Sequence, residues 1–244
     1  MTTIAILFWA GVFLVFYTYL GYGILLWTLV KIREALRPAR RYEVPAEAPE
    51  VTLLIAAYNE QEIVAEKMAN CRALEYPASK LRITWITDGS TDRTVELLAA
   101  YPDATVLHDA RRGGKTAALN RALEHIRTPL VVFTDANTML NLEAVTEIVR
   151  CFEDPQVGCV AGEKRVADAG GAGAAATEGV YWKYESKLKE LDSRLYSAVG
   201  AAGELFAVRR GLWQTLPEDT LLDDFVCSMP VSYTHLTLPT IRLV

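Results

Sequence analysis

Residues 83–92 read Ile-Thr-Trp-Ile-Thr-Asp-Gly-Ser-Thr-Asp, and residues 130–138 read Leu-Val-Val-Phe-Thr-Asp-Ala-Asn-Thr. Each is a short apolar run that ends at an acidic residue, Asp88 in the first and Asp135 in the second. Such runs are typical of the buried strands of a parallel sheet. Open α/β sheets bind ligands at the carboxyl ends of their strands. Two carboxylates at that edge favour a site for a nucleotide and a divalent cation.

Strand-like and helix-like segments alternate outward from these two runs. Strands that alternate with helices predict an α/β domain with a doubly wound, mostly parallel sheet. Ser90 or Thr91 is expected to cap the helix that follows Asp88. The expected strands lie at residues 51–56, 81–87, 105–108, 130–134, 157–162 and 205–208, and the expected helices at 60–73, 91–100, 113–126, 142–152 and 178–195.

The N-terminal region is apolar enough to enter a membrane. Residues 4–30 carry no charged side chain, and Trp9 and Trp27 lie near the ends of this stretch. About 20 apolar residues span a bilayer, and tryptophan favours its interfaces. A cleaved signal peptide fits poorly, because no basic residue precedes the run and the run is too long. A buried helix of this length would need a large protein around it. We therefore expect residues 1–31 to form one transmembrane helix.

Basic residues follow the apolar stretch and predict its orientation. An excess of Lys and Arg marks the cytoplasmic side of a span, so the N-terminus is expected outside and the following domain in the cytoplasm, at the inner (cell) membrane. Residues 32–50 are interpreted as a basic juxtamembrane linker, stiffened by prolines. The basic residues are Lys31, Arg33, Arg37, Arg40 and Arg41.

Composition excludes some classes of partner. The chain of 244 residues carries a formal net charge of −5, which gives no support for nucleic-acid binding. The cysteines show no Cys-x-x-Cys spacing, so small buried hydrophobes are expected rather than a metal site or disulfides. They are Cys71, Cys151, Cys159 and Cys227.

In their order and spacing, several segments resemble the family 2 glycosyltransferases. They are Ala-Ala-Tyr-Asn-Glu at 56–60, the Asp-Gly-Ser that begins at Asp88, the Asp-Ala-Asn that begins at Asp135, and Leu-Asp-Asp-Phe at 222–225. The resemblance runs from about residue 51 to residue 225. It implies the GT-A fold and an inverting transfer from a nucleotide-sugar, UDP-linked by preference. The expected acceptor is a cell-surface polysaccharide, another glycan or a lipid-linked acceptor, as in membrane poly-N-acetylglucosamine or cellulose-like synthases.

The resemblance also implies a donor site and a metal site. Tyr58, Glu60 and Asp88 map to the nucleotide pocket. A departing diphosphate needs Mg²⁺ or Mn²⁺ to neutralise its charge, and hard cations prefer oxygen ligands. Asp135 and Asn137 map to the metal ligands. The family's Asp-x-Asp here ends in an amide, which keeps an oxygen but loses a charge.

A basic turn precedes the helix expected at 113–126. Arg111-Arg112-Gly113-Gly114-Lys115 sets a glycine pair beside three cations at a helix start, which is a plausible anion cradle. The spacing is not that of a P-loop. Lys115 is expected to meet the diphosphate or order the donor, and a solvated basic turn is the alternative.

An inverting transfer needs a group that takes the proton of the acceptor hydroxyl, and a carboxylate can do this. By resemblance Asp224 is the expected base, with Asp223 as its neighbour; an acidic pair at a helix start is the alternative. Gly200, Gly203 and Glu204 resemble a segment that lets an acceptor sugar approach the backbone. A tight turn is the other interpretation of that segment.

Two other functions remain open from the sequence. A nucleotidyltransferase also uses a nucleotide-binding α/β sheet with acidic metal ligands, although the glycine-rich first loop expected of one is absent. A non-catalytic, membrane-tethered binding module is compatible with an amide at position 137.

The last segment departs from the pattern of the rest. Residues 230–244 have neither helical nor clear strand periodicity and resemble a translated-adapter artefact of metagenome assemblies. We therefore expect residues 51–229 to form an incomplete glycosyltransferase domain and residues 230–244 to be a foreign, irregular tail.

Overall fold

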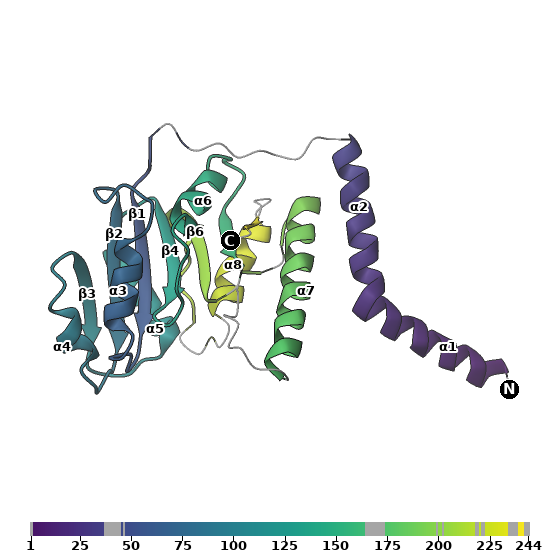
Figure 1. Ribbon diagram of the computed structural model, residues 1–244, viewed down its shortest axis with the longest axis horizontal. Coiled ribbons are helices and arrows are strands. Elements are labelled where there is room, and N and C mark those ends of the chain that lie inside the picture. Colours follow the sequence, from purple (N-terminus) through teal and green to yellow (C-terminus); the bar gives the residue numbers. More distant parts are fainter. Residues whose placement is uncertain are drawn as a thin grey trace.

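The described residues form an α/β domain joined to a long N-terminal helix (Figure 1). Arg37, Arg40, Arg41 and most of the linker expected before residue 47 lie outside the described residues. The computed structural model describes residues 2–36, 45, 47–163, 174–198, 200, 201, 203–217, 220, 223–233 and 239–241, without the side chains of 174–182, 223, 230–233, 240 and 241.

The order of the elements follows the expected alternation between residues 51 and 209. The helices are α1 (Thr2–Phe16), α2 (Tyr22–Leu36), α3 (Val64–Arg72), α4 (Thr94–Leu98), α5 (Lys115–His125), α6 (Ala144–Cys151), α7 (Ala174–Leu195) and α8 (Asp223–Tyr233), with a π-helical segment η1 (Tyr17–Gly21) and a 3-10 turn η2 (Arg210–Leu212). The strands are β1 (Val51–Ala57), β2 (Leu81–Asp88), β3 (Ala104–Asp109), β4 (Leu130–Asp135), β5 (Cys159–Gly162), β6 (Leu205–Arg209) and β7 (Thr240–Ile241).

The strands make one sheet in the order β3-β2-β1-β4-β6-β5-β7. β1 pairs in parallel with β2 and β4, and β2 pairs in parallel with β3. β6 runs antiparallel to both of its neighbours, β4 and β5. The α/β class and the mostly parallel sheet are therefore confirmed, with a reversal at β6. Hydrophobic periodicity could not reveal this reversal, because the pattern of a strand reads the same in both directions.

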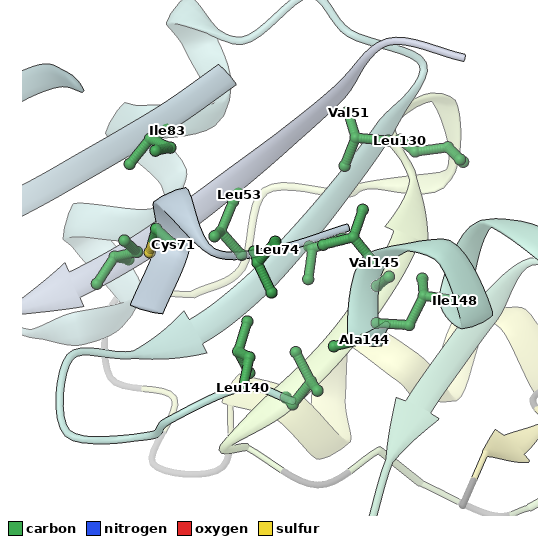
Figure 2. Packing of buried hydrophobic residues seen from close by; sticks show 14 of the residues in the cluster. Val51, Leu53, Cys71, Leu74, Ile83, Leu130, Leu140, Ala144, Val145 and Ile148 are labelled. Atoms are coloured by element: carbon green, nitrogen blue, oxygen red, sulfur yellow. The ribbon is translucent and has the colours of Figure 1, made fainter. Parts of the chain in front are cut away.

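Two apolar clusters sandwich the sheet, because successive side chains of a strand point to opposite faces. Leu53 and Ile55 of β1 pack on the face covered by α3 and α6, and Figure 2 shows part of this cluster. Leu54 of β1 packs with Leu119 of α5 on the other face. The fully buried Trp85 also donates its indole N–H to the sulfur of Met68, 3.2 Å away. The core therefore holds the central strands rigidly from both sides.

Two consecutive arginines at the end of β6 hold helix ends on opposite faces of the sheet. Arg209 donates to the carbonyls of Phe152, Asp154 and Val157, just after α6, over distances of 2.7–3.1 Å. Arg210 donates to the carbonyls of Leu123 and Ile126 at the end of α5, at 3.0 and 3.1 Å. Carbonyls at helix C-termini lack intrahelical partners and carry partial negative charge, so each guanidinium both caps a helix and offsets its dipole.

The N-terminal helix is longer than expected. It runs from Thr2 to Leu36 through α1, η1 and α2, and it is long and apolar enough to cross a membrane by length and composition. The predicted apolar helix is thus present, but it continues beyond residue 31. α2 packs on α7 through a small buried cluster of Leu26, Val30 and Leu191.

Two local expectations were wrong. Neither Ser90 nor Thr91 caps α4; instead Oδ1 of Asp92 accepts the backbone N–H of Thr94 at 3.0 Å. A short hydroxyl-bearing residue and an aspartate cap equally well, so the pattern alone did not choose between them. The segment after residue 229 is also not wholly irregular, since α8 continues to Tyr233 and β7 pairs in parallel with β5.

The cysteines behave as small hydrophobes, as expected. All four are free and buried. Burial raises the pKa of the Cys71 thiol to about 11 and that of Cys151 to about 12, so neither is a thiolate at neutral pH.

We predict that Arg209→Ala lowers the free energy of unfolding by about 2 kcal/mol, because three carbonyls near the end of α6 lose a charged donor. Arg82→Ala is the control, since Arg82 lies on the surface and pairs with Glu50 at 3.3 Å; its loss should cost below about 1 kcal/mol. Urea titration of both variants in detergent measures the difference. Equal midpoints for Arg209→Ala and the parent chain would show that the cap contributes nothing.

Candidate active site

The two predicted carboxylates lie at one edge of the sheet. Asp88 ends β2 and Asp135 ends β4, and these strands flank β1 on either side. In register, Ala56 of β1 pairs with Asp135, and Ala57 pairs with Thr87. Strands are spaced about 4.8 Å apart, so the two aspartate backbones lie about 10 Å from each other. The loop after β1, which carries Tyr58 and Glu60, leaves the sheet between them.

Asp88 organises the basic turn. It is 6% exposed, and its Oδ2 accepts the backbone N–H groups of Gly113 at 2.8 Å and Gly114 at 2.7 Å. Its Oδ1 is buried without a hydrogen bond and lies 3.5 Å from the guanidinium of Arg121. The glycine pair that was expected to cradle an anion therefore binds a carboxylate of the protein itself through its amides.

A positive φ at Gly89 makes this turn possible. Gly89 has φ +68°, and a Cβ built there would lie 2.8 Å from the Cβ of Arg112 and 2.9 Å from its backbone nitrogen. No other residue accepts both the backbone angle and the close approach without strain. The two residues of the Asp-Gly pair thus have different roles. Asp88 binds the basic turn through hydrogen bonds, and Gly89 lets the backbone of that turn approach the end of β2.

Lys115 and Asp135 form an ion pair at the centre of the edge. The ammonium of Lys115, the first residue of α5, donates to Oδ1 of Asp135 at 2.9 Å. Both side chains are about one-third exposed, so the pair faces solvent. A cation therefore sits on the carboxylate that was predicted to bind a metal ion, which shows that this oxygen is placed to receive positive charge.

The residues present fit a metal ion whose coordination shell is completed by oxygens of the substrate and by water. Among the described residues, no group of three or more His, Cys, Asp and Glu side chains could hold a metal. Asn137 is exposed in the turn after β4, two residues beyond Asp135. Mg²⁺ is commonly bound through one or two protein ligands, with waters and phosphate oxygens filling its other positions. Asp135 and Asn137 suit that arrangement and not an all-protein cage.

The loop after β1 is tied to the loop after β2. Asn59 has φ +56°, a conformation that asparagine tolerates better than most residues, and its Oδ1 accepts the N–H of Thr91 at 2.8 Å. The N–H of Glu60 donates to Oγ1 of Thr94 at 2.8 Å. Burial, and next the charge of Asp135, raise the pKa of Glu60. Sequence reasoning included Glu60 but missed Asn59, whose signal was an asparagine directly after a strand.

Tyr58 lies under a cation. The guanidinium carbon of Arg112 stands 3.9 Å from the centre of the Tyr58 ring, and the tyrosine is 40% exposed. Such a stack joins the first loop to the basic turn. Tyr58 and Asp88 therefore reach the same turn from two strands, which brings together the residues predicted for the nucleotide pocket.

The predicted glycines make room for the start of α8. A Cβ on Gly203 would lie 3.1 Å from Oδ2 of Asp224, and one on Gly200 would lie 2.5 Å from the ring of Phe225. Gly203 also lines a small hollow with Lys115 and Asp135. The expected base, Asp224, thus lies next to Gly203, which lines this hollow. Glu204 is half-buried next to Gly203, and the side chain of Asp223 lies outside the described residues.

Lys67 is a candidate functional residue that sequence reasoning missed. It lies on α3, is 0% exposed, and its ammonium donates to Oγ1 of Thr134 at 3.3 Å and to the carbonyl of Thr138. These two threonines flank the segment that carries Asp135 and Asn137. Burial lowers the pKa of Lys67 from 10.5 to about 8. The only sequence signal was a lysine at an inward position of an amphipathic helix.

A comparison with protein families identifies the family of this chain. Residues 52–216 match the family model described as Glycosyl transferase family 2. The chain belongs to glycosyl transferase family 2. The match covers β1 to the segment after β6 and so includes every predicted site residue except Asp223 and Asp224.

Curated relatives of this glycosyltransferase domain are synthases. It is 29% identical over 201 residues to a β-monoglucosyldiacylglycerol synthase of Nostoc sp., a match that covers 75% of this chain and 41% of the relative. It is 32% identical over 120 residues to the poly-β-1,6-N-acetyl-D-glucosamine synthase of Staphylococcus aureus, covering 48% of this chain and 29% of the relative. The chain therefore spans less than half the length of these relatives.

Solved structures share the fold. The mannosyltransferase PcManGT of Pyrobaculum calidifontis, in complex with GDP-Man and Mn²⁺, matches with a TM-score of 0.76 at 26% identity, covering 93% of this chain and 64% of that one. TarS of S. aureus in complex with UDP-GlcNAc matches at 0.60 and 15% identity, covering 79% of this chain and 56% of that one. The second match concerns the fold alone. The expected GT-A-like fold is confirmed.

We predict that Lys67 makes stability rise with pH. In the unfolded chain its pKa is ordinary, so between about pH 8 and 10.5 the unfolded state binds more protons than the folded state. The parent chain should gain up to about 1.4 kcal/mol per pH unit in this window relative to Lys67→Met. Denaturant titrations of both proteins from pH 7 to pH 10 measure this difference.

The comparison between the two proteins is needed because buried cysteines act in the opposite direction. Cys71 and Cys151 have raised pKa values, so they lower stability as pH rises above 9 in both proteins. A difference that stays flat across the window would show that Lys67 is neutral or unperturbed in the folded chain.

Proposed function

We propose that this family 2 domain transfers a sugar, with inversion, from a nucleoside-diphosphate sugar to a hydroxyl of a membrane-associated glycan or lipid-linked acceptor. The observation that carries the proposal is the Lys115–Asp135 ion pair at the carboxyl edge, beside a hollow that Gly203 also lines, with Asp224 next to Gly203. A cation, a candidate metal ligand and a candidate base thus lie in the region where an α/β sheet binds its ligands.

The nucleotide end of the donor fits the region of Tyr58, Glu60 and Asp88. Tyr58 offers an aromatic face, and the free Oδ1 of Asp88 is a buried acceptor that a base or ribose N–H or O–H can satisfy. The Arg112–Tyr58 stack would open or shift to admit a base. UDP is our first choice and GDP the alternative, since the mannosyltransferase with 26% identity was solved with GDP-Man.

The diphosphate fits between Lys115 and the metal ligands. A divalent ion on Asp135 and Asn137 would neutralise charge on the departing diphosphate. If Asp135 held a metal ion instead of the Lys115 ammonium, that ammonium could contact the same phosphates as a second positive charge. In this proposal, Lys115 pairs with Asp135 before the donor binds and contacts the diphosphate once the donor is bound.

Asp224 is the proposed base. Its carboxylate approaches Gly203, which lines the hollow together with Lys115 and Asp135. In the proposed reaction, an acceptor hydroxyl beside Asp224 would lose its proton to this carboxylate while its oxygen attacks the anomeric carbon. The bond from that carbon to the diphosphate would break, and the diphosphate would leave toward Lys115. Such a single displacement gives a product with the inverted anomeric configuration.

The acceptor is proposed from the N-terminal helix and the relatives. A helix that can cross a membrane is followed by basic residues, which supports a cytoplasmic domain with access to nucleotide-sugars. By their names, the two kinds of synthase found among the relatives make a diacylglycerol glycolipid and a polysaccharide. Family membership favours sugar transfer over nucleotidyl transfer.

We predict that UDP or GDP binds only with Mn²⁺ or Mg²⁺ present. Asp135→Ala should abolish this metal-dependent binding, because the charged metal ligand is lost. Asn137→Asp should bind the metal at least as tightly, because it adds a charge to the same position. Calorimetry with each nucleotide, with and without a chelator, measures both effects. Equal affinity with and without chelator in the parent chain contradicts the metal role. Weaker binding by Asn137→Asp would show that the amide of Asn137 has a role other than holding the metal ion.

We predict that Asp224→Asn leaves donor binding nearly unchanged and lowers transfer by at least about 10²-fold, the lower end of what a positioned base contributes. An amide cannot accept the proton of the attacking hydroxyl. Asp223→Asn is the matched control and should keep most of the activity. The assay uses the longest reading frame that contains the domain. Loss of donor binding in Asp224→Asn places the residue in the nucleotide pocket, and normal turnover moves the base to another group.

A further inference from the structure

The N-terminal helix does not stand free of the domain. The hydroxyl of Tyr22 donates to Oδ1 of Asp192 on α7 at 2.7 Å, and the hydroxyl of Tyr184 donates to the carbonyl of Tyr19 at 2.6 Å. Gly23 permits this approach, because a Cβ there would lie 3.2 Å from the Tyr184 hydroxyl and 3.3 Å from Leu188. α2 and α7 therefore run side by side from the first turn of α2.

Charged side chains accompany this contact along α2. Arg194 of α7 pairs with Glu34 of α2 and, at 3.0 Å, with Glu190. Arg33 of α2 donates to the carbonyl of Arg194. Charged groups avoid the hydrocarbon core of a bilayer. A docked α7 would carry Asp192 and its neighbours into that core if the bilayer covered α2, so α2 must lie outside it.

The segment before α2 is long enough to span the bilayer alone. α1 has 15 residues and η1 has five, and none of them is buried. At 1.5 Å per residue these cover about 30 Å, the thickness of a hydrocarbon core. The helix changes direction between α1 and α2 (Figure 1), at the π-helical segment. Such segments are a known cause of bends.

α2 also carries an apolar stripe that the domain leaves uncovered. Leu25, Leu29, Ile32 and Leu36 follow the spacing i, i+4, i+7, i+11, which puts them on one side of the helix, and all four are exposed. A different side, with Leu26 and Val30, packs on α7. Lys31 lies away from the exposed stripe and its side chain is 55% exposed. An apolar stripe with basic neighbours, continuous with a membrane-spanning helix, suits a lipid surface.

We propose that the bilayer core ends at η1 and that α2 lies along the membrane surface, with its apolar stripe in the boundary between headgroups and acyl chains and its other side docked on α7. This inference rests on the membrane attachment proposed above. The catalytic domain is then held directly on the lipid surface. In Figure 1, β1 begins at the end of the molecule where α2 finishes, so the carboxyl ends of the strands lie toward the end where α1 enters the membrane.

Site-directed spin labels test the depth of each position. Single cysteines replace Gly11, Leu25, Leu29 and Lys31 in the whole chain, reconstituted in phosphatidylcholine vesicles with one-fifth phosphatidylglycerol. Accessibility to oxygen and to a neutral nickel chelate gives the depth of each label. A Cβ at Gly11 meets nothing within 4 Å, so a label there does not disturb packing. The parent chain is the background control, because its native cysteines are buried.

The expected result is a deep label at Gly11, shallow labels of equal depth at Leu25 and Leu29, and a water-exposed label at Lys31. Equal depth at positions four residues apart means that α2 lies in the plane of the surface. Depth that instead changes steadily from Leu25 to Lys31 means that α2 crosses the core, and overturns the inference while leaving membrane attachment intact. A water-exposed label at Gly11 overturns the membrane attachment itself.

Discussion

The parallel arrangement of β2, β1 and β4 is the constraint on which the site depends. Because the three strands run the same way, their carboxyl ends meet at one edge, and Asp88, the loop after Ala57 and Asp135 become neighbours there. Buried residues on both faces hold these strands, so the loops that follow them start from fixed points. Each loop is then tied to the next by a polar side chain: Asn59 to Thr91, and Asp88 to the glycine pair.

Charged side chains of both signs gather at the turn after β4. The turn after β4 carries one carboxylate, Asp135, where the family pattern has two, and two lysines approach it: Lys115 from solvent and Lys67 from the core. A second carboxylate in this turn would add negative charge, whereas the amide of Asn137 adds none beside the two ammonium groups. Such a site favours an anionic ligand such as a diphosphate, which brings its own oxygens to a metal ion.

Much of this could be read from the sequence because it depends on local patterns. Apolar runs that stop at Asp88 and Asp135 revealed the strands and the edge, and the order of the motifs revealed the family. The direction of β6 could not be read, because it depends on how α7 returns the chain to the sheet. The burial of Lys67 could not be read either, since a helix pattern shows which face is inward and not which lysine finds carbonyl and hydroxyl acceptors there. The glycine pair shows the third kind of limit: its amides do bind an anion, but the anion is the carboxylate of Asp88.

The reversal of β6 has a consequence for how the sheet selects its pairing. An antiparallel strand ends where the helices between parallel strands also end, so Arg209 and Arg210 arrive at the carbonyl ends of α6 and α5. Side chains alternate between faces along a strand, so a slip of one residue would turn each arginine toward the other face and away from the carbonyls that it now binds. The arginine pair therefore favours the observed pairing register of β6. A shifted β6 would lose these hydrogen bonds on both faces of the sheet. The apolar residues of the strand alone would specify its register only through their alternation between faces.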